Sequence, residues 1–235
     1  MRALIKTLIL CSFSLAFFAC GDINSIHEEY LNRGEEIYTG VIDSLKAYTG
    51  DEQVKFTWEI NADPRITKTV IYWNNGVDSS VVEVNRTQGG VMLMEKILKL
   101  PEDSYIFKFV TKDDEGHKSL SVEKTVEIYG PNYTSTLRNR EVGAITSQSD
   151  GSVKLSWGSI EDITLLHTIV TYTKYTDSSD PLISEVIVAN NISESILPDI
   201  KVGDEITVSS VYLPENSLDT FKANATTYRI PAVEK

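Results

Sequence analysis

GDEQVKFTWE at residues 50–59 and SDGSVKLSWG at residues 149–158 are two copies of one pattern, and they decide the fold. In each copy three apolar residues alternate with polar ones, as they do on a strand with one buried face. A second strand follows each copy at the same spacing, TKTVIYW at 67–73 and LHTIVTYT at 166–173. The 99-residue offset between the copies is kept through both strands. The chain therefore contains two copies of one module.

The rest of both modules predicts an all-β fold. Short runs rich in Val, Ile, Thr and Tyr are separated by Asn-Gly, Asp-Gly and Leu-Pro turns, and no long stretch has helical periodicity. About 90 residues with this pattern supply the seven strands of a sandwich of two antiparallel sheets. We predict sandwiches at residues 40–130 and 141–232, joined by a linker at 131–140.

The aromatic residues of the first module follow an order, with Trp58 on the second strand, Tyr72 on the third, and Tyr105, Phe107 and Phe109 on the sixth. This order resembles that of a fibronectin type III domain. The resemblance implies that Tyr105 forms the tyrosine corner of that fold. The second module has Ile206 near that place, so the resemblance is weaker there.

The first 20 residues, MRALIKTLILCSFSLAFFAC, indicate export. A basic start precedes an apolar run at residues 7–19, which is too short to span a bilayer, so we predict a signal peptide at residues 1–19. The end of this stretch resembles a bacterial lipobox, which implies lipidation of Cys20. The alternative is an ordinary secretory signal followed by a chance cysteine. Residues 20–39 are polar and acidic and predict a tether, the alternative being a short packed helix.

Composition excludes several function classes. The formal net charge of −12 disfavours nucleic acid as a partner, which clustered Lys and Arg would attract. Cys20 is the only cysteine left after cleavage, so no intramolecular disulfide is expected. Neither a GxSxG elbow nor a phosphate loop is present, and we expect a non-catalytic protein without a cofactor.

A metal site is not expected either. The three histidines show no HExxH or related spacing. Residues 113–116, DDEG, carry consecutive acidic side chains without the alternation of a calcium loop, and we interpret them as a solvated hairpin tip.

Two longer stretches, DSLKAYTGDEQVKFTWEINADPRITKTVIYWNNGVDSSVV at 43–82 and LPEDSYIFKFVTKDDEGHKSLSVEKTVEIYG at 100–130, carry a second resemblance. They are similar to a family of Bacteroidota lipoproteins with a domain of unknown function, often found near glycan-utilisation systems, over residues 38–140. The resemblance implies an outer-membrane lipoprotein, surface-exposed or periplasm-facing. It also implies a role in capturing polysaccharide, alone or within an outer-membrane protein complex.

Trp73, Asn74 and Asn75 are the first candidates for ligand binding. An Asn-Gly pair favours a tight type I′ hairpin, which would leave Trp73 beside the tip, where its ring could stack on a sugar. The alternative is that its own sheet or the neighbouring module covers Trp73.

The linker supplies a second candidate group, Tyr133, Arg138 and Arg140, because clefts are common at domain junctions. The alternative is a structural role in joining the modules. Asp43-Ser44-Leu45 also resembles the short O-glycosylation motif of Bacteroidota, which implies a glycan on Ser44.

These observations predict a non-catalytic, lipid-anchored cell-envelope protein that binds glycans as an accessory to polysaccharide uptake. The alternative is a spacer or protein-interaction lipoprotein, which would need an apolar or edge-strand patch instead of an aromatic platform.

Overall fold

The computed structural model describes residues 37–86, 89–176 and 180–232, and strands and turns dominate them. The strands of the first module are β1 (Ile42–Gly50), β2 (Gln53–Ile60), β3 (Lys68–Trp73), β4 (Asp78–Glu83), β5 (Met92–Lys99), β6 (Asp103–Lys112) and β7 (Val122–Ile128). Those of the second are β8 (Val142–Ser147), β9 (Val153–Trp157), β10 (Leu165–Lys174), β11 (Leu182–Ala189), β12 (Glu194–Leu197), β13 (Glu205–Tyr212), β14 (Phe221–Lys222) and β15 (Thr226–Arg229). A 3-10 turn, η2 (Asn74–Gly76), follows β3, and a short helix, α3 (Pro131–Thr136), follows β7.

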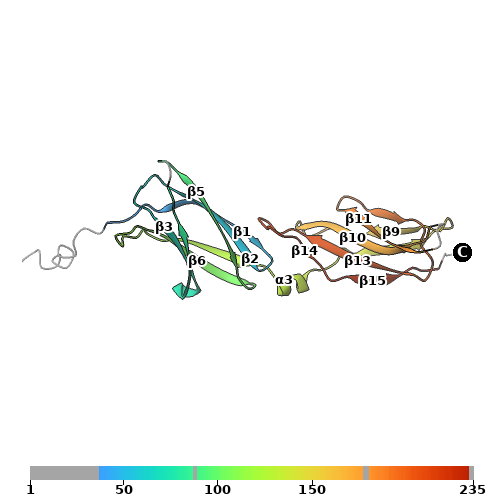
Figure 1. The fold of residues 1–235 in the computed structure, drawn as a ribbon. Coiled ribbons are helices and arrows are strands. Elements are labelled where there is room, and N and C mark those ends of the chain that lie inside the picture. The colour runs from blue at the N-terminus through green and yellow to red at the C-terminus, as the bar shows by residue number, and fades with distance from the viewer. Residues whose placement is uncertain (1–36, 87–88, 177–179, 233–235) are drawn as a thin grey trace, which may run out of the picture. The chain divides into compact units, whose positions relative to one another are not determined.

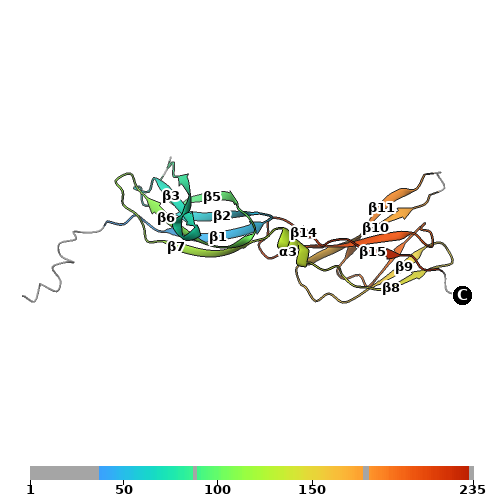
Figure 2. The ribbon, with the colours of Figure 1, turned by 90° about the horizontal axis from the view of Figure 1, so that it is seen from below.

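Both modules have the same sheet topology (Figure 1, Figure 2). In the first, a β1-β2-β5 sheet and a β4-β3-β6-β7 sheet share one hydrophobic core. In the second, the orders are β8-β9-β12 and β11-β10-β13-β14, with β15 also paired to β13, and a separate core lies between the sheets. The predicted all-β fold of fibronectin type III-like sandwiches is confirmed. The chain from Thr39 onward forms one compact unit, so the domain boundaries stay a prediction.

The apolar residues of the repeated pattern are buried, as their alternation predicts. Val54, Phe56 and Trp58 on β2 are fully buried, and their counterparts on β9 are at most 7 % exposed. The Phe56 ring meets Phe107 and Phe109 edge-on, with centroid distances of 4.7 and 5.1 Å. Edge-to-face pairs of this kind add to the stabilisation that apolar burial provides. The first core is thus organised around an aromatic cluster.

The two repeated tryptophans differ in whether the indole N–H has a hydrogen-bond partner. Trp157 Nε1 donates a hydrogen bond to Ser195 Oγ at 2.9 Å. Trp58 Nε1 is buried and has no hydrogen-bond partner among the described residues. A buried donor without a partner costs free energy, so Trp58 stabilises the fold through packing alone.

Within the part of the chain that the structure describes, the first module alone has a tyrosine corner. Tyr105 Oη donates to the carbonyl oxygen of Pro101 at 3.1 Å, which confirms the role implied by the resemblance. In the second module, Ile206 lies near that place in the sequence, is fully buried in the core and offers no hydroxyl.

The first module begins slightly earlier than predicted. Thr39, assigned to the tether from sequence, is 3 % exposed, and its hydroxyl lies 2.8 Å from Thr111 Oγ1. The carboxylate of Asp63, in the connection between β2 and β3, also accepts a hydrogen bond from the backbone N–H of Gly40 at 2.9 Å. These contacts attach the segment before β1 to the sandwich.

Asp63 makes the stability of this attachment depend on pH. Hydrogen bonds from the Arg65 side chain are the largest influence and lower the pKa of Asp63 from 3.8 to about 2. Because the pKa is lower in the folded state, the carboxylate stabilises the fold above pH 3.8, and that contribution is lost as the pH falls through about 2. We expect Asp63→Ala to lower the free energy of unfolding by about 1 kcal/mol near neutral pH.

Urea unfolding at several pH values between neutrality and acid tests this expectation. The difference between the native chain and Asp63→Ala should shrink as the pH falls. Asp180→Ala, at an exposed aspartate, is the control and should differ little from the native chain at any pH. A difference that stays constant on acidification would contradict the assigned role of Asp63.

Candidate functional site

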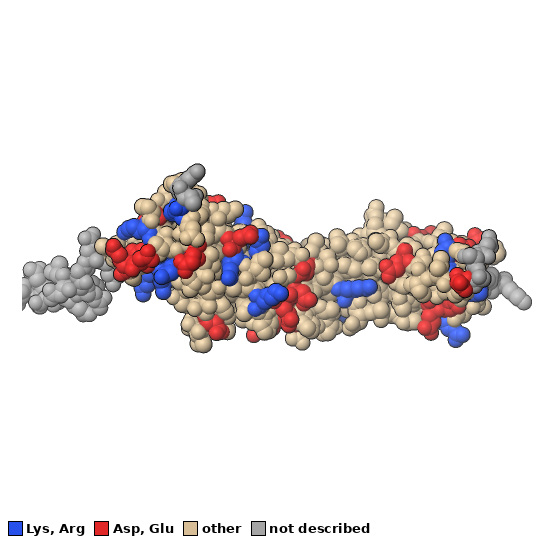
Figure 3. Space-filling view, in the orientation of Figure 1, with Lys and Arg blue, Asp and Glu red and all other residues tan. Residues whose placement is uncertain are grey.

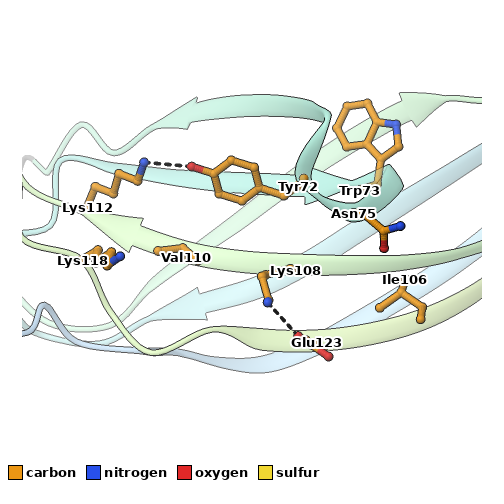
Figure 4. Close-up of a pocket in the computed structure, with 10 residues that line it drawn as sticks. Tyr72, Trp73, Asn75, Ile106, Lys108, Val110, Lys112, Lys118 and Glu123 are labelled. Carbon is orange, nitrogen blue, oxygen red and sulfur yellow. Dashed lines mark hydrogen bonds and ion pairs between the residues drawn. The ribbon is translucent and has the colours of Figure 1, made fainter.

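A cleft of about 610 Å³ lies on the outward face of the β4-β3-β6-β7 sheet (Figure 4). Its walls combine aromatic and aliphatic side chains with ammonium and carboxylate groups. The lining residues are Tyr72, Trp73, Asn75, Gly76, Ile106, Lys108, Val110, Lys112, Lys118 and Glu123.

Strand alternation explains which side chains face this cleft. Ile71 and Phe109 are register partners on β3 and β6, and both are fully buried in the core. The neighbouring register pair, Tyr72 and Lys108, therefore points to the opposite face, where the cleft lies. Val110, two residues beyond Lys108, lines the same surface.

Tyr72 and its lysine neighbours form the polar framework of the cleft. Lys112 Nζ donates to Tyr72 Oη at 2.8 Å and lies 5.5 Å from the ring centroid. Lys108 Nζ lies 3.1 Å from the carboxylate of Glu123. Figure 4 draws both interactions, with the tyrosine ring reaching along the cleft toward Lys112. The ring is thus held at its hydroxyl end.

Trp73 lies at the end of β3 but is partly turned toward the core. Its ring centroid is 6.1 Å from that of Phe107, and the side chain packs partly buried against the first core. Figure 4 shows Trp73 and Tyr72 pointing in different directions from the same strand. Trp73 therefore contributes one wall of the cleft, whereas Tyr72 is the aromatic side chain that lies along it.

The turn after Trp73 is longer than the predicted two-residue hairpin. Trp73 pairs with Asp78, so four residues separate the strands. Asn74, Asn75 and Gly76 all have positive φ, a backbone region that Asn and Gly tolerate best. Asn75 lines the cleft, whereas Asn74 Nδ2 donates to the Asp78 carboxylate at 2.6 Å. Three consecutive left-handed residues need this wider loop.

The second candidate group lies around a different cleft, of about 500 Å³, formed by the linker and the second module. Tyr133, Arg138 and Arg140 all line it, together with three acidic residues, Glu141, Glu161 and Asp162. Tyr133, Arg138 and Arg140 are close together in the sequence, and they line the same cleft. They differ in how much of each side chain is accessible.

Arg140 is engaged in packing the second module. It is 8 % exposed, its Nε donates to the Gly158 carbonyl at 3.0 Å, and its guanidinium lies 5.7 Å from the centroid of Trp157. Burial lowers the pKa of this guanidinium. Arg138 is exposed instead, and its backbone carbonyl accepts a hydrogen bond from the Tyr212 hydroxyl.

Tyr133 on α3 belongs to an aromatic cluster. Its ring centroid lies 4.5 Å from that of Tyr129 and 5.1 Å from that of Phe221. Burial raises the pKa of Tyr133. Ser44, the predicted glycosylation site, is exposed and lies in a bulge of β1 with φ of 52°. Cys20 lies outside the described residues.

The tip of the hairpin between β6 and β7 is exposed at residues 114–116, as predicted, whereas the first acidic residue is buried. Asp113 is 6 % exposed, and its carboxylate lies 2.6 Å from His117 Nδ1. Burial works to raise the pKa of Asp113, but the hydrogen bonds from His117 outweigh it, and the net shift is downward. With Glu115, these residues place three potential metal ligands within 4.8 Å of one another. Asp113 also accepts backbone N–H groups of the same turn, so the arrangement stabilises the hairpin.

Charged side chains are mixed over the surface. Figure 3 shows acidic and basic groups interspersed on the face in view. Among the described residues, no helix is long and apolar enough to cross a membrane.

The sheet topology and the tyrosine corner define a protein of fibronectin type III-like sandwiches. The chain belongs to the DUF4998 family, a domain of unknown function, whose profile matches residues 20–221. The match reaches well into the second module, beyond the residues 38–140 assigned to the family from sequence. No curated protein matches the sequence.

Solved structures with related architecture include two from chicken. The FN1–FN3 domains of CNTN1 align with 11 % identity and a TM-score of 0.37, covering 83 % of this chain and 68 % of that one. A two-domain fibronectin type III segment of tenascin aligns with 12 % identity and a TM-score of 0.32, covering 82 % and 100 %.

Proposed function

We propose that this protein is a non-catalytic, lipid-anchored component of a bacterial cell envelope that binds polysaccharide in the cleft over β3 and β6. Lipidation of Cys20 would hold it at an outer membrane, surface-exposed or periplasm-facing. The cleft is the observation that carries the proposal. It offers an aromatic ring and aliphatic side chains beside hydrogen-bonding groups, which is the combination that a sugar needs for its apolar face and its hydroxyls.

Tyr72 and Trp73 have different roles in this proposal. The ring of Tyr72 would stack against a sugar, while Trp73 and Asn75 border the bound chain at the turn. The linker cleft is less suited to this role, because the guanidinium of Arg140 is already occupied by backbone carbonyls and the Trp157 ring.

Affinity electrophoresis in native gels containing soluble polysaccharides tests the proposal. We expect the chain without its signal peptide and lipid cysteine to be retarded by at least one polymer, and Tyr72→Ala to abolish that retardation. Stacking of an aromatic side chain on a ligand is worth about 1 kcal/mol or more, which is enough to remove weak binding. Trp73→Ala should weaken the retardation less, since its ring is partly buried.

Thr125→Ala is the matched control, an exposed position on the neighbouring β7 that does not line the cleft. Retardation that survives in Tyr72→Ala would argue against this cleft. Absence of retardation across a broad panel would argue against glycan binding altogether.

One observation favours the alternative of a spacer or protein-interaction module. Among the described residues, β11 is an edge strand that pairs with β10 alone, and Ile183 and Ile187 on it are 75 % and 68 % exposed. An exposed apolar edge of this kind could accept a strand from a partner protein. A panel without any retarding polymer would favour this function.

A further inference from the structure

We propose that the cleft over β3 and β6 selects acidic polysaccharides, with Lys112 and Lys118 binding a carboxylate or sulfate group of the polymer. This inference rests on the proposed function and adds to it the chemical class of the ligand.

The charge of the cleft is opposite to that of the protein. Three lysines and one glutamate line it, in a chain with a formal net charge of −12. Lys108 and Glu123 neutralise each other as an ion pair at 3.1 Å. Within the described residues, no carboxylate lies within 4 Å of the ammonium groups of Lys112 and Lys118. The cleft therefore keeps two positive charges without a carboxylate partner.

These two lysines lie at the same end of the cleft. Their backbones form an isolated antiparallel bridge at the base of the hairpin that follows β6. Figure 4 shows Lys112 and Lys118 near one end of the residues that line the cleft, with Ile106 toward the other end. An anionic substituent bound by the lysines would thus place the sugar ring that carries it near Tyr72 and Val110.

Two acidic side chains of the hairpin after β6 already have hydrogen-bond partners. The Asp113 carboxylate is bonded to His117, and Asp114 accepts a hydrogen bond from Thr67 Oγ1 at 3.0 Å. A neutral polymer would gain little from the two ammonium groups, whereas an acidic one would gain a charge-assisted hydrogen bond from each. Elsewhere the acidic chain would repel a polyanion, so selectivity has to come from this local site.

Pairs of polymers with the same backbone, one charged and one neutral, test the preference for acidic ligands separately from glycan binding itself. We would measure dissociation constants for polygalacturonate and its methyl ester, and for dextran sulfate and dextran. The first pair tests a carboxylate and the second a sulfate. The protein should bind at least one acidic polymer about tenfold more tightly than its neutral partner. The preference should disappear between about 10 mM and about 1 M NaCl, where the Debye length falls from about 30 Å to about 3 Å.

Lysine variants then test whether the preference for acidic polymers comes from the cleft. The double variant Lys112→Gln/Lys118→Gln should lose the preference, about tenfold in affinity. Lys118→Gln alone should lose part of the preference. This variant leaves Lys112 and its hydrogen bond to Tyr72 in place. The charge-matched control is Lys124→Gln/Lys222→Gln, at two exposed lysines outside the cleft.

The outcomes are distinguishable. Equal affinity for charged and neutral partners would overturn the inference and leave glycan binding intact. An acidic preference that both double variants reduce equally would also overturn it, since the effect would then come from overall charge. No binding to any polymer would overturn the proposed function and the inference with it.

Discussion

Phe56→Ala is expected to lower the free energy of unfolding by about 4 kcal/mol. The side chain is fully buried, and its ring makes edge-on contacts with Phe107 and Phe109. Truncation removes apolar burial, leaves a cavity between the sheets and breaks two aromatic pairs at once. Urea unfolding followed by tryptophan fluorescence would measure the loss, because Trp58 and Trp73 both pack in this core.

Two variants serve as controls for this measurement. Thr57→Ala changes the next residue along β2, which points away from the core, and should alter stability by less than about 0.5 kcal/mol. Leu155→Ala changes the repeated position of the second module and should destabilise its separate core instead. A loss below about 1 kcal/mol for Phe56→Ala would contradict the central place of the aromatic cluster.

Arg140→Ala is expected to cost about 3 kcal/mol of stability. The substitution leaves the Gly158 carbonyl without its buried donor, takes one of two donors from the Ala189 carbonyl, and removes the group that lies over Trp157. Arg140→Lys keeps a charge but cannot reproduce the planar fork of donors, so it should recover only part of the loss. Urea unfolding of the three proteins measures this order.

Arg138→Ala is the matched comparison, the same residue type two positions earlier in an exposed place. It should change stability by less than about 0.5 kcal/mol. If Arg140→Ala left stability unchanged, its assignment to the packing of the second module would be wrong.

The features predicted best from sequence are those with a strict period. Burial of Val54, Phe56 and Trp58 follows from alternation, and the likeness of the two modules follows from the repeat. The corner role of Tyr105, which bonds to Pro101, was implied by the resemblance to fibronectin type III domains. Each of these is decided by residues close together in the chain or by a simple repeat.

The features that sequence reasoning missed depend on neighbours from distant strands. Alternation on β6 could have revealed the outward lysines, since Lys108 and Lys112 interleave with the residues predicted to be buried. Their convergence with Tyr72 required the register between β3 and β6. Burial of Arg140 in the linker had no periodic signal, because carbonyls from the second module create its environment.

The hydrogen bond between Lys112 and the Tyr72 hydroxyl also bears on the entropy of binding. Ordering a mobile side chain at an interface costs about 0.5–1.5 kcal/mol. A tyrosine ring anchored at its far end has lost much of that freedom before a ligand arrives. Its flat face is therefore a preorganised platform, and more of the stacking energy is available as affinity.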